Sequence, residues 1–336
     1  MALLPQLFDL ALVDLDGVVY VGPDAVPGSV EAIAQSHRLG MRTAFVTNNA
    51  GRPASQVADH LRSLGIDVHD EDVVTSAMAA ADLLAHRLPA GSAVGIVGGV
   101  GVSASVEAAG LRAVAPSSPE AVAILMGFGP DISWRDLASA SYAVAAGALF
   151  VATNTDRTFP TPQGIAPGSG SFVAAVQEAS GVTPLVAGKP EPTLYRNAID
   201  RFQAKNALVI GDRLDTDIAG AINAGLTSLL VLSGICSAKH AVLAPLGQRP
   251  DLIAADLQGL VTEQVFIRDI VSDIANSGQR WEHRGWSAHL EGAVVVVTAP
   301  ARDQGQSADG VDGVRCAAAA AWAQEDQVVD VVGLDR

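Results

Sequence analysis

The 336-residue sequence has few cysteines, few basic residues and no long apolar run. Its two cysteines, Cys236 and Cys316, lie far apart and match neither a metal-ligand spacing nor a disulfide framework. We therefore expect both to be free thiols. The seven histidines form neither an H-x-x-H nor an H-E-x-x-H pattern, so the sequence does not indicate a histidine-based metal site.

Basic residues are outnumbered, because 21 lysines and arginines stand against 36 aspartates and glutamates, for a net charge of −15. Nucleic acids and anionic membranes attract basic surfaces, so neither is the expected partner. A small anionic substrate is compatible with this charge if its pocket is locally positive. No apolar stretch approaches the ~18 residues that span a bilayer, and the N-terminal MALLPQLFDL lacks a basic segment. The sequence therefore predicts a soluble cytoplasmic protein.

What the sequence does contain is an alternation of short apolar runs with amphipathic stretches of helical length, from residue 8 to about residue 235. This alternation is typical of βα units and predicts an α/β fold with a parallel sheet. The length and the 49% hydrophobic content suffice for two or three domains with real cores. The strands expected around one site are residues 8–14, 42–47, 183–187, 207–211 and 227–232.

Two aspartates, Asp14 and Asp16, stand at the carboxyl end of the first of these strands, in the stretch LALVDLDGVVY. Residues two apart in an extended chain point to the same side, so the two like charges would share a face. A metal ion could hold both, one carboxyl could stay protonated and act as an acid, or both could be solvated in a loop. Ligands of open parallel sheets bind at the carboxyl ends of the strands, where this pair stands.

Groups suited to phosphate or metal follow other strands as well. Asp212 and Asp217 in GDRLDTD add carboxylates, and several carboxylates on one sheet edge would require a cation such as Mg²⁺, although helix capping would use the same residues. Thr47 and Asn48 in FVTNN could bind a phosphate oxygen or cap a helix. Lys189, between a glycine and a proline in AGKPEP, would hold a phosphate as a fixed point charge.

This ordered set of motifs resembles the haloacid dehalogenase-like phosphatases, and DLDGVVY, FVTNN, GKPEP and GDRLDTDI resemble the NagD-type branch in detail. The resemblance covers roughly residues 8–260. It implies a Rossmann-like core, residues 1–80 and 182–261, interrupted by an inserted α/β cap, residues 81–181, that selects the substrate. Such a cap could close over a substrate and keep water from the reacting centre. Because caps of this kind often mediate dimers, the resemblance also allows a homodimer.

The resemblance implies a role for each motif residue. Asp14 would attack phosphorus to form an aspartyl-phosphate, and Asp16 would protonate the leaving alkoxide and then activate water. Mg²⁺ would be held by Asp14, the backbone carbonyl of Asp16 and Asp212. Asp217 would orient metal-bound water or Lys189. The residues that would bind the transferring phosphoryl group are Thr47, Asn48 and Lys189.

Two parts of the chain lie outside these motifs. In the cap, TNTDRTFP makes Asn154, Asp156 and Arg157 candidates for contacts with the leaving group, and a structural turn would explain the same residues equally well. Residues 262–336 are predicted to form a small C-terminal α/β module that faintly resembles the pyrophosphate-binding turn of an N-acetyltransferase. The module is too short for that whole fold, so we interpret it as a fragment with a regulatory or structural role. Its removal is expected to leave the four motifs assembled.

Together these resemblances predict a Mg²⁺-dependent phosphomonoester hydrolase that acts on a small phosphorylated metabolite. The sequence looks most like actinobacterial members assigned to phospholipid and glycerol metabolism, so the expected substrate is glycerol 3-phosphate, giving glycerol and phosphate. Phosphoglycolate, pyridoxal phosphate and nucleotides are the alternative substrates. A phosphotransferase would share every motif. A non-catalytic regulator that binds a nucleotide or acyl-CoA is the alternative from another class, and the presence of both Asp14 and Asp16 favours the enzyme.

Overall fold

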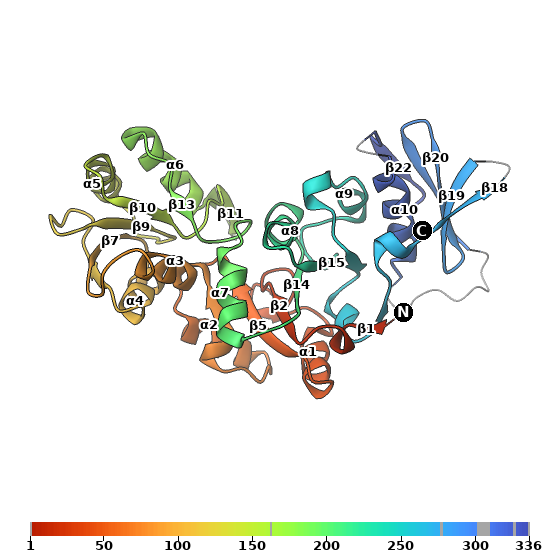
Figure 1. Cartoon of the computed structure of the whole chain (residues 1–336), viewed down its shortest axis with the longest axis horizontal. Helices are drawn as coiled ribbons and strands as arrows, with labels where there is room; N and C mark the ends of the chain where they lie inside the picture. The colour runs from red at the N-terminus through yellow and green to blue at the C-terminus, as the bar shows by residue number, and fades with distance from the viewer. Residues whose placement is uncertain (1, 162, 276–277, 301–309, 325–326, 335–336) are drawn as a thin grey trace. The chain divides into compact units, whose positions relative to one another are not determined.

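The computed structural model of the chain divides into two compact units (Figure 1). The described residues are 2–161, 163–275, 278–300, 310–324 and 327–334. The first unit comprises Met1–Ala44, Leu64–Ile66 and Phe202–Arg336, and the second comprises Phe45–Ser63 and Asp67–Arg201. Across these described ranges, none of the helices combines the length and the apolar character that a membrane span requires.

One sheet has six strands in the order β16-β15-β14-β2-β5-β6, of which β16, β15, β14 and β2 belong to the first unit. Its strands are β2 (Leu10–Val13), β5 (Arg42–Thr47), β6 (Val73–Thr75), β14 (Ala207–Gly211), β15 (Thr227–Val231) and β16 (Leu252–Ala254). The pairs β14/β15, β14/β2, β15/β16 and β5/β6 are all parallel. Every residue of β2 and β14 is buried, which explains why these strands read as continuous apolar runs in the sequence. Four of the five strands predicted around the site are confirmed in this sheet, as β2, β5, β14 and β15.

Short helices alternate with these strands along the chain. They are α1 (Ser29–Arg38), α2 (Ala54–Ser63), α3 (Ser76–Ala85), α7 (Thr193–Phe202), α8 (Ala219–Ala224) and α9 (Ala238–Val242). Helix α1 buries Ala32, Ile33 and Ser36 along one face, as the helical period dictates. Helix α8 ends at Gly225, whose left-handed conformation (φ 71°) a glycine adopts without a steric penalty.

The second unit contains a separate parallel sheet with the order β13-β10-β9-β7-β8. Its strands are β7 (Ala93–Val97), β8 (Arg112–Val114), β9 (Ala123–Met126), β10 (Leu149–Ala152) and β13 (Leu185–Val186), and the helices of the same stretch are α4 (Val100–Ala108), α5 (Trp134–Ala145) and α6 (Ser169–Ser180). Helix α5 begins with a reciprocal capping box between Ser133 and Asp136. The inserted segment thus forms α/β structure of its own, as the sequence predicts.

Within the predicted strand 183–187, only Leu185–Val186 form a strand, and it lies in a different sheet from the one expected. This strand, β13, pairs in parallel with β10, through Val151 opposite Leu185 and Ala152 opposite Val186. It therefore extends the sheet of the second unit and does not adjoin β2. An apolar run marks a strand, whereas the choice of its hydrogen-bonding neighbour depends on tertiary contacts that the run does not encode.

The C-terminal part of the first unit forms a five-stranded sheet in the order β18-β19-β20-β21-β22. Its elements are β18 (Ser272–Ala275), β19 (Gly278–His283), β20 (Trp286–Glu291), β21 (Val294–Thr298), helix α10 (Asp312–Trp322) and β22 (Asp330–Val332). The first three pairs are antiparallel and β21/β22 is parallel. Helix α10 joins one hydrophobic cluster that also contains Val242, Ile253, Trp281 and Trp286. The predicted strand and helix of this module are thus present, and the loop residues 301–309 lie outside the described residues.

Three short antiparallel pairs complete the described strands. They are β1 (Ala2–Leu3) with β17 (Glu263–Gln264), β3 (Tyr20–Val21) with β4 (Asp24–Ala25), and β11 (Thr158–Thr161) with β12 (Gly164–Pro167). The predicted domain boundaries at residues 81, 182 and 262 stay predictions, and so does the acetyltransferase-like origin of the terminal module.

Candidate active site

Three aspartates of the first unit bring their carboxylates together. Asp14 follows β2, Asp212 follows β14, and Asp217 lies in the π-helical turn Leu214–Ile218. One oxygen atom from each of the three carboxylates lies within 4.8 Å of the other two. Asp212 and Asp217 are each 1% exposed, so water screens their mutual repulsion poorly. An all-oxygen set of this kind fits Mg²⁺, which would offset the repulsion.

The turn after β14 directs Asp215 and Asp217, which lie two residues apart in the motif GDRLDTD, toward different partners. Asp217 points back, and its Oδ2 accepts a hydrogen bond from the backbone N–H of Arg213 at 3.2 Å. Gly211 permits this approach, since a Cβ there would lie 2.2 Å from the Asp217 side chain. Asp215 instead pairs with the Arg213 guanidinium at 2.8 Å. Burial raises the pKa of Asp215, but the Arg213 hydrogen bond and charge outweigh it and leave the pKa below its ordinary value.

The loop that follows β15 holds Asp212 in place. The backbone N–H of Ile235 donates to Asp212 Oδ2 at 2.7 Å, and that of Cys236 donates to the Asp212 carbonyl at 3.1 Å. The Ser233 hydroxyl donates to the carbonyl of Gly17 at 2.8 Å. Gly234 packs so closely that a Cβ would lie 2.0 Å from Asp212 Oδ2. The motifs of the sequence indicate no role for this loop, although its serine and glycine follow the predicted strand directly.

Asp16 lies in the turn after β2, and its side chain is exposed. The chain reverses at Gly17, which has a φ of +83° and donates its N–H to the carbonyl of Tyr20 at 2.9 Å. A Cβ at Gly17 would also lie 2.5 Å from Asp212 Oδ2. The glycine of DLDG is therefore required both by backbone conformation and by the space that Asp212 occupies. The carboxylate of Asp16 is not one of the three that converge in this part of the described structure.

In the second unit, Asn48 links the end of β5 to the loop of Lys189. The Asn48 Oδ1 accepts the backbone N–H of Lys189 at 2.8 Å, and its Nδ2 donates to the Lys189 carbonyl at 3.1 Å. The same Nδ2 donates to Asp156 Oδ2 at 3.1 Å. The Asn48 side chain thus fixes the backbone that carries Lys189, a role distinct from the predicted direct contact with phosphate.

Thr47 and Lys189 carry the groups suited to an anion in this unit. Lys189 is 3% exposed, and its Nζ donates to the carbonyl of Val46 at 3.3 Å, so the ammonium group lies at the end of β5. The Thr47 hydroxyl oxygen accepts the backbone N–H of Asn49 at 3.0 Å, which leaves its proton to be donated elsewhere. A buried ammonium and an oriented hydroxyl together favour a phosphate oxygen.

All three predicted cap contacts make hydrogen bonds within the second unit, and Arg157 does so through its backbone carbonyl, which accepts the Ser171 hydroxyl at 2.6 Å. Asn154 is buried, and its Nδ2 donates to the carbonyl of Asn48 at 2.8 Å. The backbone N–H of Asp156 donates to Asn154 Oδ1 at 3.1 Å, the pattern of a structural turn. Arg157 is exposed. Ser76, at the start of α3, is not among the residues predicted from the sequence, and its hydroxyl also donates to the Asn48 carbonyl at 2.7 Å.

Family models match both parts of the chain that carry these motifs. A model described as haloacid dehalogenase-like hydrolase matches residues 11–112, and a HAD-hydrolase-like model matches residues 186–260. The two matches include Asp14, Thr47, Lys189 and Asp212.

Among curated proteins, a D-glycerol 3-phosphate phosphatase of Mycobacterium tuberculosis is 43% identical over 319 residues, which cover 94% of this chain and 86% of the relative. An acid sugar phosphatase of Staphylococcus aureus is 34% identical over 226 residues, 67% of this chain and 86% of the relative. A crystal structure of the glycerol phosphate phosphatase Rv1692 from Mycobacterium tuberculosis in complex with magnesium superposes with a TM-score of 0.86 at 42% identity, covering 99% of this chain and 96% of that one.

Proposed function

Because this chain belongs to the haloacid dehalogenase-like hydrolase family and is a Mg²⁺-dependent phosphatase, we propose that its substrate is glycerol 3-phosphate. The observation that supports this substrate is the 43% identity to a D-glycerol 3-phosphate phosphatase over 94% of the chain. The match to the acid sugar phosphatase covers only 67% of the chain. The products of the proposed reaction are glycerol and inorganic phosphate.

The proposed mechanism assigns the chemistry of the reaction to the two aspartates of DLDG. The Asp14 carboxylate attacks phosphorus, the ester bond breaks, and the departing alkoxide takes a proton from Asp16. Asp16, now ionised, accepts a proton from the water that cleaves the aspartyl-phosphate. The exposure of Asp16 supports this role, because a group that serves substrate and water in turn must be reachable by both.

The three converging carboxylates are the proposed Mg²⁺ site, with Asp14 and Asp212 as ligands together with the carbonyl of Asp16. Bound Mg²⁺ would supply positive charge beside the phosphate oxygens. Asp217 belongs to the same cluster and is proposed to orient the ligands of the ion. The close packing of Gly17 around Asp212 supports a rigid carboxylate at this position.

The phosphoryl group is proposed to contact Thr47 and Lys189. Lys189 would offset the charge that develops on the phosphoryl oxygens, and the Thr47 hydroxyl would donate to one of them. Asn48 would act by fixing the Lys189 backbone, which its two reciprocal hydrogen bonds support. Contacts of Asn154, Asp156 and Arg157 with the glycerol end stay a proposal, for which the exposed Arg157 is the most suitable group.

We further propose that the protein acts in the cytoplasm on a small phosphorylated metabolite. Its net charge of −15 disfavours nucleic acid and anionic membranes as partners. A homodimer is the proposed assembly, which the molar mass in solution would test.

The experiment that tests the function is phosphate release from a panel of esters, with and without Mg²⁺, by the wild type and by Asp14→Asn. The panel contains glycerol 3-phosphate, a sugar phosphate, phosphoglycolate, pyridoxal phosphate and a nucleoside monophosphate. We expect Mg²⁺-dependent release, with the highest kcat/KM for glycerol 3-phosphate. Asp14→Asn should lower kcat by a factor of at least about 10⁴, because the nucleophile of the covalent step is lost.

Preference for another ester would replace glycerol 3-phosphate as the substrate and leave the reaction class intact. Full activity of Asp14→Asn would contradict the covalent mechanism. Transfer of the phosphoryl group to an added alcohol in competition with water would identify a phosphotransferase.

A further inference from the structure

The loop that holds Asp212 leads directly into a short helix. Ile235 and Cys236 donate their backbone N–H groups to Asp212, and α9 begins at Ala238 after an N-cap by Ser237. The Ser237 hydroxyl accepts the N–H of His240 at 3.3 Å. Only one residue separates the last contact with Asp212 from the first residue of α9. A shift of α9 therefore moves the donors of Asp212 as well.

Helix α9 is held by the C-terminal helix α10 and the strand β22. The indole N–H of Trp322, the last residue of α10, donates to the carbonyl of Val242 at 3.0 Å. Val242 is the last residue of α9, and its side chain is buried in the hydrophobic cluster that α10 shares. Lys239 pairs with Asp330 of β22 at 2.6 Å. The two ends of α9 are thus tied to the terminal part of the chain.

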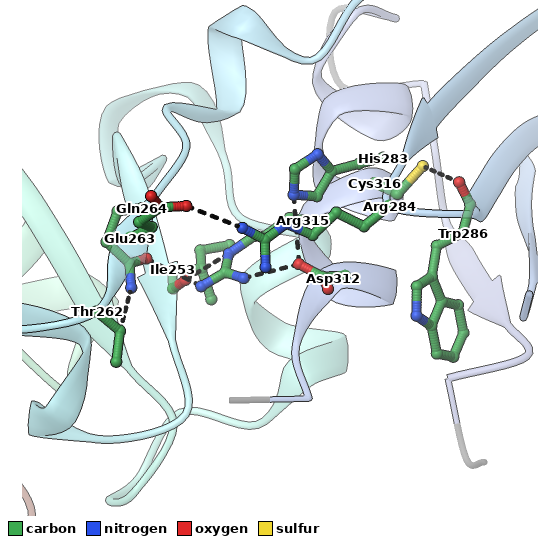
Figure 2. Close-up of polar contacts among 10 residues, drawn as sticks. All are labelled: Ile253, Thr262, Glu263, Gln264, His283, Arg284, Trp286, Asp312, Arg315 and Cys316. Atoms are coloured by element: carbon green, nitrogen blue, oxygen red, sulfur yellow. Dashed lines mark hydrogen bonds and ion pairs between the residues drawn. The ribbon is translucent and has the colours of Figure 1, made fainter. Parts of the chain in front are cut away.

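Helix α10 is itself anchored by a buried arginine (Figure 2). Arg315 is 1% exposed, and its Nε donates to the carbonyl of Ile253 in β16 at 2.9 Å. Its two terminal nitrogens donate to Gln264 Oε1 and to Asp312 Oδ1, each at 2.9 Å. Asp312 also faces His283 Nε2 at 3.3 Å. A buried guanidinium with partners on three segments fixes both the position and the rotation of α10, because the planar fork tolerates little displacement.

We propose that Trp322 is a positioning residue for the metal site, which it supports through Val242, α9 and the loop that holds Asp212. In this arrangement α10 holds a fixed position, and α9 packs against it. The loop then holds the Ile235 N–H in position to donate to Asp212 before Mg²⁺ binds. This inference rests on the proposed Mg²⁺ site, and it assigns to the C-terminal segment a role in the affinity for Mg²⁺.

The test compares Trp322→Phe with the wild type. Phenylalanine keeps an aromatic ring in the cluster and removes the N–H donor. We expect the Mg²⁺ dissociation constant of the metal-free protein, measured by calorimetry, to rise about two- to tenfold, the range that corresponds to one hydrogen bond. Amide hydrogen exchange of residues 233–237 should accelerate in the variant. In phosphate release, the Mg²⁺ concentration for half-maximal rate should rise while kcat at saturating Mg²⁺ stays within about twofold.

Trp134→Phe is the matched control, because Trp134 begins α5 in the second unit and is 77% exposed. Arg315→Lys is a second variant, which keeps the charge but loses the fork; it should weaken Mg²⁺ binding in the same direction. If Trp322→Phe matches the wild type both in Mg²⁺ affinity and in exchange of residues 233–237, the proposal is overturned.

Failure of the wild type to bind Mg²⁺ would overturn both this inference and the proposed metal site. Binding of Mg²⁺ without any phosphate release would contradict the proposed function alone, because the comparison of dissociation constants and exchange rates would still decide the role of Trp322.

Discussion

Cys236 and Cys316 are both buried, and burial raises the pKa of each thiol to about 12. The negative charge of Asp212 adds to the shift at Cys236. The Cys316 thiol donates to the backbone carbonyl of Trp281 at 2.9 Å. Since the thiolate is the reactive form, both residues should be inert in the folded protein at neutral pH.

We therefore predict that iodoacetamide at pH 8 leaves both cysteines of the native protein unmodified and alkylates both in denaturant. Because the pKa of about 12 lies well above pH 8, roughly one thiol in 10⁴ is ionised at this pH. Intact mass before and after unfolding measures the outcome. Rapid alkylation of the native protein would show that a thiol is accessible and ionised.

The same two thiols make the free energy of unfolding depend on pH in the alkaline range. In the unfolded chain they ionise near their ordinary pKa of 9.0, whereas in the folded protein they stay protonated up to about pH 12. The folded state therefore binds more protons across this interval, and the free energy of unfolding should fall as pH rises from about 9 toward 12. Replacing both cysteines with alanine should flatten that fall in urea titrations.

At the scale of elements, the loop after β5 is held by two other loops of the second unit. The Asn48 side chain accepts a hydrogen bond from the Lys189 N–H and donates one to the Lys189 carbonyl. The Asn48 carbonyl accepts hydrogen bonds from the Ser76 hydroxyl and from the Asn154 side-chain amide. Gly188 allows this approach, because a Cβ there would lie 2.5 Å from Asn48 Oδ1. The position of the Lys189 ammonium thus depends on an amide at the end of another strand.

We predict that Asn48→Ala lowers the free energy of unfolding by about 1–3 kcal/mol, because the backbone N–H and carbonyl of the buried Lys189 lose the hydrogen bonds of the Asn48 side chain. It should also lower kcat/KM for phosphate release, since Lys189 is no longer held. Urea unfolding and steady-state kinetics measure the two effects. Asn49→Ala is the matched control, because Asn49 is exposed and its side chain accepts the N–H of Gly51, at a distance of 2.9 Å, within the same loop. Equal behaviour of the two variants would contradict the role of Asn48.

At the scale of the whole molecule, the C-terminal segment shares a hydrophobic cluster with the parallel sheet of the first unit. Helix α10 is buried along almost its whole length, in a cluster that includes Leu230 of β15 and Ile253 of β16. From the sequence alone, residues 262–336 are expected to form an appendage whose removal leaves the motifs assembled. The shared cluster leads us to a different expectation, because removal would expose the apolar side chains that α10 covers.

We predict that a chain ending at residue 261 is less stable than the full chain by more than ~3 kcal/mol, given that loss of even one large buried side chain costs about that much. Circular dichroism and urea unfolding of the two chains measure the difference. A truncated chain with the stability and the Mg²⁺ affinity of the full protein would show that the segment is an independent appendage.

The sequence by itself determined the type of most elements and the chemistry of the motifs. Apolar runs marked β2, β5, β14 and β15, and the acidic groups after β2 and β14 indicated Mg²⁺, because strand periodicity and ligand preference are local properties. Only the tertiary structure decided that β13 pairs with β10. It also decided that Asn48 holds the Lys189 backbone and that α10 packs on α9. These features depend on contacts between segments far apart in the chain, which no local pattern encodes.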